Sequence, residues 1–268
     1  MKTLSRIYNG LIFAFLYAPI LVLIVFSFND SKSRVVWNGF SLRWYEELFR
    51  DEEILAALGV TLSVAIIATI VSTIIGTLAA IGIRSVNRRL GKVLLAVNNF
   101  PMVNPEIVTG IALMLLFVFV YRTTGLLQPG YATLLLSHIT FCIPYVILQV
   151  MPKLRQANPH LYEAAVDLGC PPVSAFFKVM VPEILPGIIT GALMAFTMSL
   201  DDFVISLFTS GASAQNLSVT IYAMVKRRVT PEINALSTLM FGAVLILLVI
   251  INILQIRSEP SRKGGKTK

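Results

Sequence analysis

Long apolar runs separated by short polar segments dominate this chain. About 20 apolar residues are needed to cross roughly 30 Å of hydrocarbon, and six runs have that length or more. Each is predicted to be a helix because hydrocarbon offers no hydrogen-bond partner to an unpaired backbone group. The predicted membrane-spanning segments are residues 7–28, 58–83, 93–121, 131–151, 187–209 and 234–256.

The composition agrees with this pattern. Hydrophobic residues make up 56% of the chain and charged residues 13%, whereas soluble domains carry about 25% charged residues. The first run follows Lys2 and Arg6 but is longer than a secretory h-region and has no small-residue cleavage site, so it is expected to stay as an anchor. We therefore predict an all-α, polytopic membrane protein with one domain, residues 1–268.

The distribution of Lys and Arg predicts the orientation. With the N-terminus inside, the inner segments hold fourteen of these residues and the outer segments eight, and excess Lys and Arg marks the cytoplasmic side. Both termini, the loop 152–186 and the basic tail 257–268 are then cytoplasmic. The outer cluster Lys226, Arg227 and Arg228 opposes this assignment. The net charge of +8 is attributed to orientation, and no nucleic-acid partner is expected.

The segment 29–57, the longest predicted outer loop, contains an amphipathic stretch. Trp44, Tyr45, Leu48 and Phe49 share one helical face. The stretch is expected to lie at the bilayer surface with its aromatic rings at headgroup level, or to form a docking surface for an external partner.

The inner loop contains signals for two short helices that meet at a corner. Asn158 can cap a helix of about two turns, and Gly169 suits the left-handed position that ends it. Pro171 and Pro172 follow shortly after and prevent the helix from continuing. A second helix is predicted from about 173 to 181, ended by Pro182.

The first of these helices has the features of a docking surface. Ala164 and Ala165 are small enough for another protein to approach closely, Glu163 adds a charge, and Leu161 and Leu168 add apolar contacts. An ordinary amphipathic connector is the alternative, because Glu-Ala-Ala favours helix anywhere.

Three acidic residues fall inside predicted spans: Glu106, Asp201 and Asp202. An ionised side chain at the bilayer centre costs about 2.5–3.5 kcal/mol on insertion scales, and the six spans contain no Lys or Arg. These acids must be protonated, hydrated, paired with another subunit or facing a cationic cargo. The structural alternative is a hydrogen bond from Glu106 to a neighbouring helix and a hydrated outer vestibule for the aspartates.

Residues near the acids fit a cavity in the membrane. Pro101 and Pro105 are expected to break the third span before Glu106, and broken helices often border transport sites. Phe203, with Phe208, is placed to bind an ammonium group through its ring face. The lone His138 is expected to be a satisfied helix-packing residue.

Several motifs resemble one family. Glu163-Ala164-Ala165, then Gly169, then Val179, Val181 and Pro182 keep the spacing of the loop by which bacterial ABC importer permeases grip their ATPase, with valines in place of Ile and Leu. Residues 26–29, 137–144, 199–203, 221–226 and 231–235 resemble the PotC-type permeases of spermidine/putrescine importers. The likeness runs from about 17 to 256.

The resemblance implies a MetI-like helical core in the bacterial inner membrane. It implies a sister permease, an ABC ATPase dimer and an extracytoplasmic polyamine-binding protein as partners. Glu163, Ala164, Ala165 and Gly169, with Leu161 and Leu168, would contact the ATPase. Asp201, Asp202, Glu106 and Phe203 are expected along the cargo path.

Other functions fit less well. An importer permease for another small solute differs only in cargo, whereas an ion-coupled carrier or channel would leave the inner loop without a purpose. A hydrolase using Asp201 and Asp202 is disfavoured because helix neighbours diverge by about 100°. The sequence Gly264-Gly265-Lys266-Thr267 lacks the earlier glycine of a phosphate-binding loop. We expect no catalytic residue, cofactor or metal site.

Overall fold

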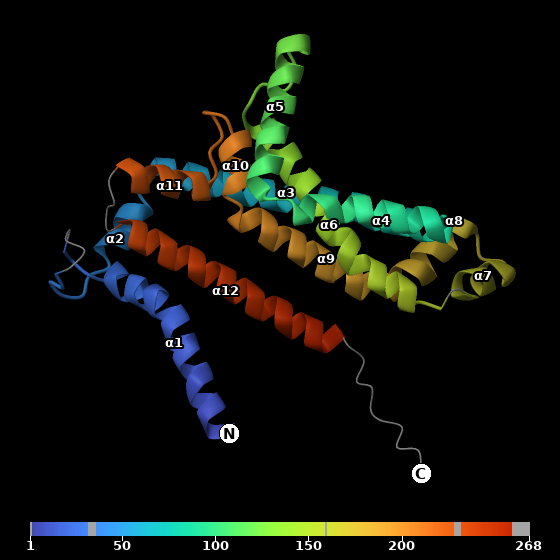
Figure 1. Cartoon of the computed structure of the whole chain (residues 1–268), viewed down its shortest axis with the longest axis horizontal. Coiled ribbons are helices and arrows are strands. Elements are labelled where there is room, and N and C mark those ends of the chain that lie inside the picture. Colours follow the sequence, from blue (N-terminus) through green and yellow to red (C-terminus); the bar gives the residue numbers. More distant parts are fainter. Residues whose placement is uncertain (1, 32–35, 159, 228–231, 259–268) are drawn as a thin grey trace. The chain divides into compact units, whose positions relative to one another are not determined.

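The structure, a computed structural model, describes residues 2–31, 36–158, 160–227 and 232–258. In these residues the regular structure is helical apart from an isolated bridge between Asn29 and Phe40, which confirms the all-α prediction. Five described segments are long and apolar enough to cross a membrane, and a shorter apolar helix covers Glu232–Ile246. The elements (Figure 1) are α1 Lys2–Ser27, α2 Arg43–Leu48, α3 Glu52–Ser85, α4 Arg88–Val103, α5 Glu106–Thr124, α6 Tyr131–Gln156, α7 His160–Asp167, α8 Pro172–Ala175, a π-helical segment Phe176–Met180, α9 Val181–Asp201, α10 Val204–Thr209, α11 Leu217–Arg227 and α12 Glu232–Ser258.

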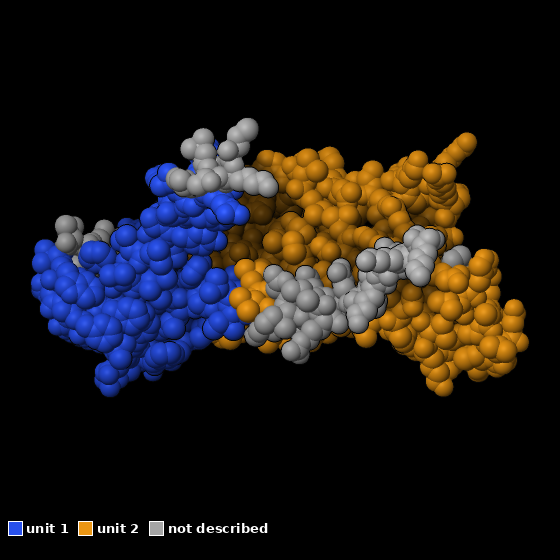
Figure 2. All heavy atoms as spheres, turned by 90° about the horizontal axis from the view of Figure 1, so that it is seen from below, with its two compact units in different colours: residues 1–58, 219–247 blue, residues 59–218, 248–268 orange. Residues whose placement is uncertain are grey.

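The chain forms two compact units, coloured separately in Figure 2. Unit 1 comprises Met1–Leu58 and Val219–Leu247, and unit 2 comprises Gly59–Ser218 and Leu248–Lys268. All residues expected to contact the ATPase or to lie along the cargo path are in unit 2. The single domain predicted over 1–268 stays a prediction, and each unit is described by itself.

In unit 1, the segment between α1 and α3 is held by a buried tryptophan. Trp44 is 2% exposed, and its indole N–H donates to the Asn29 carbonyl at 2.6 Å. The Ser27 and Tyr45 hydroxyls share a hydrogen bond at 2.8 Å. Trp44 is therefore packed within the protein and its N–H is satisfied there, and the expectation that this stretch lies at the bilayer surface stays a prediction.

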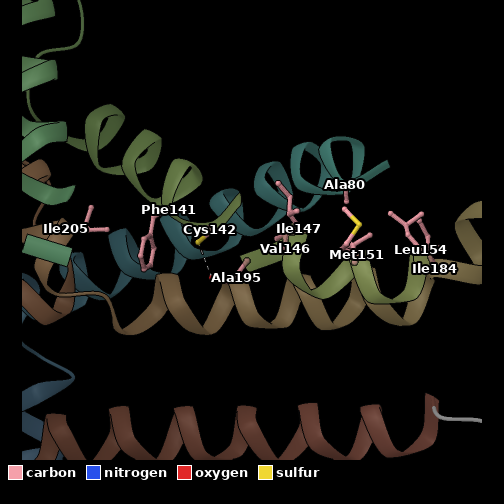
Figure 3. Close-up of a cluster of buried hydrophobic side chains, with 11 residues drawn as sticks. Ala80, Phe141, Cys142, Val146, Ile147, Met151, Leu154, Ile184, Ala195 and Ile205 are labelled. Carbon is pink, nitrogen blue, oxygen red and sulfur yellow. Dashed lines mark hydrogen bonds between the residues drawn. The ribbon is translucent and has the colours of Figure 1, made fainter. Parts of the chain in front are cut away.

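In unit 2, helices α3, α6 and α9 pack closely around Val146. Val146 is fully buried, and Gly76 of α3 and Gly191 of α9 both face it. A Cβ at Gly76 would lie 2.8 Å from the Val146 side chain, and one at Gly191 would lie 3.3 Å from the Val146 Cα. The buried apolar cluster along α6, drawn in Figure 3, continues from this crossing to Leu154 and Ile184.

We expect Gly76→Leu to destabilise the folded chain by about 1–3 kcal/mol, the usual cost of forcing extra atoms into a packed core. Gly82→Leu is the matched control, because Gly82 lies on the same helix with no neighbouring atom within 4 Å of its would-be Cβ. The measurement is the thermal melting of the purified, detergent-solubilised assembly. Equal melting temperatures for the two variants would contradict this packing.

The expected third span consists of two helices, so the predicted break before Glu106 is confirmed, but Pro101 does not contribute to it. Helix α4 runs through Pro101 to Val103, and α5 begins at Glu106 and turns away from α4 (Figure 1). The break lies at Asn104 and Pro105, where Asn104 is extended with ψ 144°, because a proline disfavours the helical conformation at the residue before it. Among the described residues of this pair, α5 is long and apolar enough to cross a membrane and α4 is not.

The prediction that Pro182 ends the second inner-loop helix is also wrong. Residues Pro172–Asp201 form one apolar helical segment of 30 residues. The Val181 N–H bonds to the Phe176 carbonyl, five residues back, in the π-helical segment just before Pro182. This wider turn accommodates a residue that has no N–H to donate and whose ring would clash with a regular turn.

Candidate functional site

The first element of the site is α7, a helix with no buried residue. Its start is capped as predicted, since the Asn158 side chain accepts from the His160 N–H at 3.0 Å. The adjoining Pro159 lies outside the described residues. Glu163 is exposed and accepts from the exposed His160 ring at 3.2 Å, a surface contact of little energetic weight.

Helix α7 ends in the left-handed corner predicted from Gly169. Gly169 has a φ of 85°. Its N–H bonds to the Val166 carbonyl at 2.9 Å, and the Cys170 N–H bonds to the Ala165 carbonyl at 3.1 Å. This pair of bonds is a Schellman motif, in which glycine carries the left-handed residue without steric penalty.

The corner leaves apolar side chains uncovered. Leu168 is 89% exposed and Leu161 is 38% exposed. Ala164 is exposed and Ala165 half-buried. Contiguous apolar exposure on a helix of this length, beside an exposed carboxylate at Glu163, is typical of a protein-docking surface. We call Leu161, Glu163, Ala164, Ala165 and Leu168 the α7 surface.

The α7 surface is connected to the membrane-spanning helices by a continuous rod. The segment Pro172–Asp201 has 30 residues, so at 1.5 Å per residue it extends about 45 Å. Helix α7 packs against α8 and the π-helical residues at the start of this segment, and the segment ends at Asp201. A single helical segment therefore connects α7 to the acidic residues.

The second element is a buried polar network at the end of that rod. Asp202 is 8% exposed, and its carboxylate accepts from the Ser206 N–H and the Ser206 hydroxyl, both at 2.8 Å. The Asn216 amide donates to the Asp202 carbonyl oxygen at 3.0 Å and to the Ser206 hydroxyl oxygen at 2.7 Å. Asp202 thus caps the short helix α10 from the break between α9 and α10.

His138 of α6 connects this network to α9. Its Nδ1 is 2.7 Å from the Ser199 hydroxyl and its Nε2 is 2.9 Å from the Ser206 hydroxyl. The Nε2 is also 3.6 Å from the Asp202 carboxylate. The prediction of a satisfied helix-packing histidine is confirmed.

The hydrogen bonds of Ser206 constrain the proton positions on His138. The single hydroxyl proton of Ser206 goes to Asp202, and the Ser206 oxygen accepts from Asn216. The Nε2 of His138 then donates to that oxygen, and in the neutral ring the Nδ1 accepts from the Ser199 hydroxyl.

Asp201 and Asp202 are thus separated by the fold. Asp201, the last residue of α9, is exposed. A carboxylate at a helix C-terminus is disfavoured by the helix dipole, so the fold gains no stability from an acid there. The sequence analysis offered protonation, hydration, pairing with another subunit or contact with a cationic cargo for these acids. Asp202 is instead satisfied by hydrogen bonds within its own chain.

Glu106 occupies the first turn of α5 and is exposed. A carboxylate at this position is stabilised by the helix N-terminus. The break predicted just before Glu106 is confirmed, and it places this acid at a helix start rather than within a continuous helix.

The two phenylalanines also differ. Phe203 is half-buried at the start of α10. Phe208 packs against α5, where a Cβ at Gly110 would meet its ring at 2.9 Å. The Phe208 ring therefore contributes to the packing of α5 against α10.

Sequence reasoning missed Ser199, Ser206 and Asn216. The i, i+4 spacing of Asp202 and Ser206 is the one local signal for their contact. The other partners come from distant segments and carry no such signal.

Two basic residues of the outer cluster are described. The Lys226 Nζ lies 4.7 Å from the centroid of the Tyr222 ring, and Arg227 is exposed. Arg228 and residues 259–268 of the predicted tail lie outside the described residues.

A helical membrane chain with an exposed helix joined to its spans fits the class of transport permeases. The chain belongs to the family described as the binding-protein-dependent transport system inner membrane component, which it matches over residues 72–264. The predicted transport subunit of the inner membrane is confirmed at this level.

Particular relatives are transport permeases of named polyamine systems. The chain is 43% identical over 257 residues to the putrescine transport system permease protein PotI of Escherichia coli (strain K12), covering 93% of this chain and 90% of that protein. It is 36% identical over 247 residues to the spermidine/putrescine transport system permease protein PotC of Haemophilus influenzae, covering 92% and 94%.

Solved structures show the same fold. A chain of a bacterial ABC transporter involved in the import of the acidic polysaccharide alginate matches with a TM-score of 0.74 and 16% identity, covering 97% of this chain and 96% of that one. A chain of the MetNI methionine ABC transporter matches with a TM-score of 0.57 and 18% identity, covering 81% and 97%. These matches confirm the MetI-like fold.

Proposed function

We propose that this chain is a permease subunit that moves polyamines into the cell. The assignment of polyamines as the cargo is supported by 43% identity to PotI and 36% identity to PotC over more than nine-tenths of this chain. Polyamines are polycations, and the exposed Asp201 offers a carboxylate that an ammonium group can bind.

The proposed assembly has a sister permease, two copies of an ABC ATPase and an extracytoplasmic polyamine-binding protein. The ATPase would receive the α7 surface, which is exposed and partly apolar. Both termini and the loop 152–186 would be cytoplasmic, as the Lys and Arg distribution favours.

In the proposed mechanism, ATP binding closes the ATPase dimer and displaces α7. The rod Pro172–Asp201 carries this displacement to the α9–α10 break, where the Asp202 network ties α10 to α6. The cargo would cross between the two permeases past Asp201, Phe203 and Glu106. Asp202 has a positioning role in this account because its carboxylate is buried.

Uptake of labelled putrescine and spermidine tests this function in cells that lack their own polyamine importers. Cells expressing all four components should accumulate polyamine, and each omission should abolish the uptake. An assembled, ATP-hydrolysing complex that imports another solute and no polyamine would retain the importer and refute the cargo.

A further inference from the structure

A cavity of about 440 Å³ lies where α3 ends, α4 begins and α6 ends, all within unit 2. Gly91 brings α4 close to α3, since a Cβ there would lie 3.1 Å from the Ile83 carbonyl oxygen. Four basic residues line the cavity, and its described lining includes no acid: Arg84, Arg88, Lys92 and Arg155.

These cations are available to an external ligand. All four are exposed. None takes part in the ion pairs found among the described residues, which join Arg43 to Glu47, His138 to Asp202 and His160 to Glu163. Four like charges around one cavity repel one another, and an anion would relieve that repulsion. The N-terminus of α4 adds a further positive potential.

The surroundings favour a lipid phosphate over a soluble one. On α4 the basic residues of the first turns are followed by Val93, Val97 and Phe100, which are 58%, 64% and 66% exposed. Such a change from cations to exposed apolar side chains marks the boundary between headgroups and acyl chains.

A second cavity adjoins the basic cavity. It has a volume of about 420 Å³ and shares Leu95, Met151 and Arg155 with the basic cavity. Its other described lining residues are the apolar Leu148 and Pro152 and the polar Asn99 and Gln156. A molecule with a phosphate in the basic cavity can place a hydrocarbon chain along this second one.

We propose that Arg84, Arg88, Lys92 and Arg155 form a binding site for the phosphate of an anionic phospholipid in the leaflet on the predicted cytoplasmic side. Basic pockets between membrane helices on that side bind anionic headgroups in general. This site is separate from the cargo path and from the α7 surface. It contacts α3, α4 and α6, so the lipid would stabilise their arrangement next to α7.

The test is retention of lipid by the assembled importer, measured by native mass spectrometry. The complex is purified from nanodiscs containing dioleoylphosphatidylglycerol and dioleoylphosphatidylcholine in equal amounts. The wild-type complex should retain the phosphatidylglycerol selectively. The triple variant Arg84→Gln/Arg88→Gln/Arg155→Gln should retain about 100-fold less, because each basic residue near an anionic lipid contributes roughly fivefold.

Arg89→Gln is the matched control, since Arg89 is an exposed basic residue of the same helix that does not line the cavity. It should retain lipid as the wild type does. The charge-conserving variant Arg84→Lys/Arg88→Lys/Arg155→Lys should do the same. If the triple glutamine variant does not assemble, Arg155→Gln alone should still lower retention several-fold. Equal retention of both lipids, or equal loss in Arg89→Gln, would overturn the proposal.

Inorganic phosphate and glycerol 3-phosphate provide the second arm of the test. Neither should displace the phosphatidylglycerol, because neither has a hydrocarbon chain to contact Leu95, Leu148 and Met151 of the second cavity. Displacement by inorganic phosphate alone would show a site for soluble phosphate and overturn the lipid assignment. Retention involves no transport step, so a wrong cargo assignment would leave this result unchanged.

Discussion

Replacing Asp202 with alanine is expected to destabilise the assembled permease by about 2–4 kcal/mol. The variant removes the acceptor of the backbone N–H groups that start α10, a cap worth about 1 kcal/mol, and it leaves the buried Ser206 hydroxyl without its acceptor, at about 1–3 kcal/mol. His138 loses its nearest carboxylate, 3.6 Å away. The measurement is the melting temperature and yield of the detergent-solubilised complex.

Asp201→Asn is the matched control, one residue away. Asp201 is exposed, so its substitution should leave stability within about 0.5 kcal/mol of wild type. Under the proposed function it should instead lower polyamine uptake, because a charge-assisted contact is worth about 1.5–3 kcal/mol, or roughly 10- to 150-fold. The assignment fails if Asp202→Ala melts like wild type while Asp201→Asn does not assemble.

Glu163→Lys is expected to separate the permease from its ATPase. Glu163 is exposed at the centre of the α7 surface, and reversing a charge buried by a partner costs about 2–5 kcal/mol, or roughly 30-fold to several thousand-fold in affinity. Co-purification of the ATPase and uptake should be lost together. The folded permease should keep its melting temperature, because no buried residue of α7 is changed.

Glu183→Lys is the control for Glu163→Lys. Glu183 is an exposed acid in the first turn of α9, so its reversal changes the charge of the same region by the same amount outside the α7 surface. ATPase binding should survive in this variant. Unchanged ATPase binding in Glu163→Lys, or its loss in both variants, would contradict a specific contact at α7.

Local chemistry explains which parts of this fold could be predicted. The Gly169 corner and the Asn158 cap depend on residues within a few positions of each other, so their geometry follows from the sequence. The break before Glu106 could also be predicted, because Pro105 acts on the residue directly before it. Pro101 was expected to contribute to that break but lies within α4. The prediction that Pro182 ends a helix was wrong because the π-helical turn that accommodates this proline has no known signature in these residues.

The Asp202 network shows what a single sequence does not contain. His138 contacts residues 61 and 68 positions away, and only the crossing of α6 with α9 and α10 brings them together. Charge alone pointed to Asp201 and Asp202 equally. The break after α9 then buries one carboxylate and exposes the other.

Uptake of labelled putrescine and spermidine by the complete four-component assembly tests the central claim most directly. The account predicts saturable, ATP-dependent accumulation that unlabelled polyamines compete away and that disappears when the ATPase, the sister permease or the binding protein is omitted. Polyamine accumulation that persists without the ATPase while a proton gradient is maintained would contradict it.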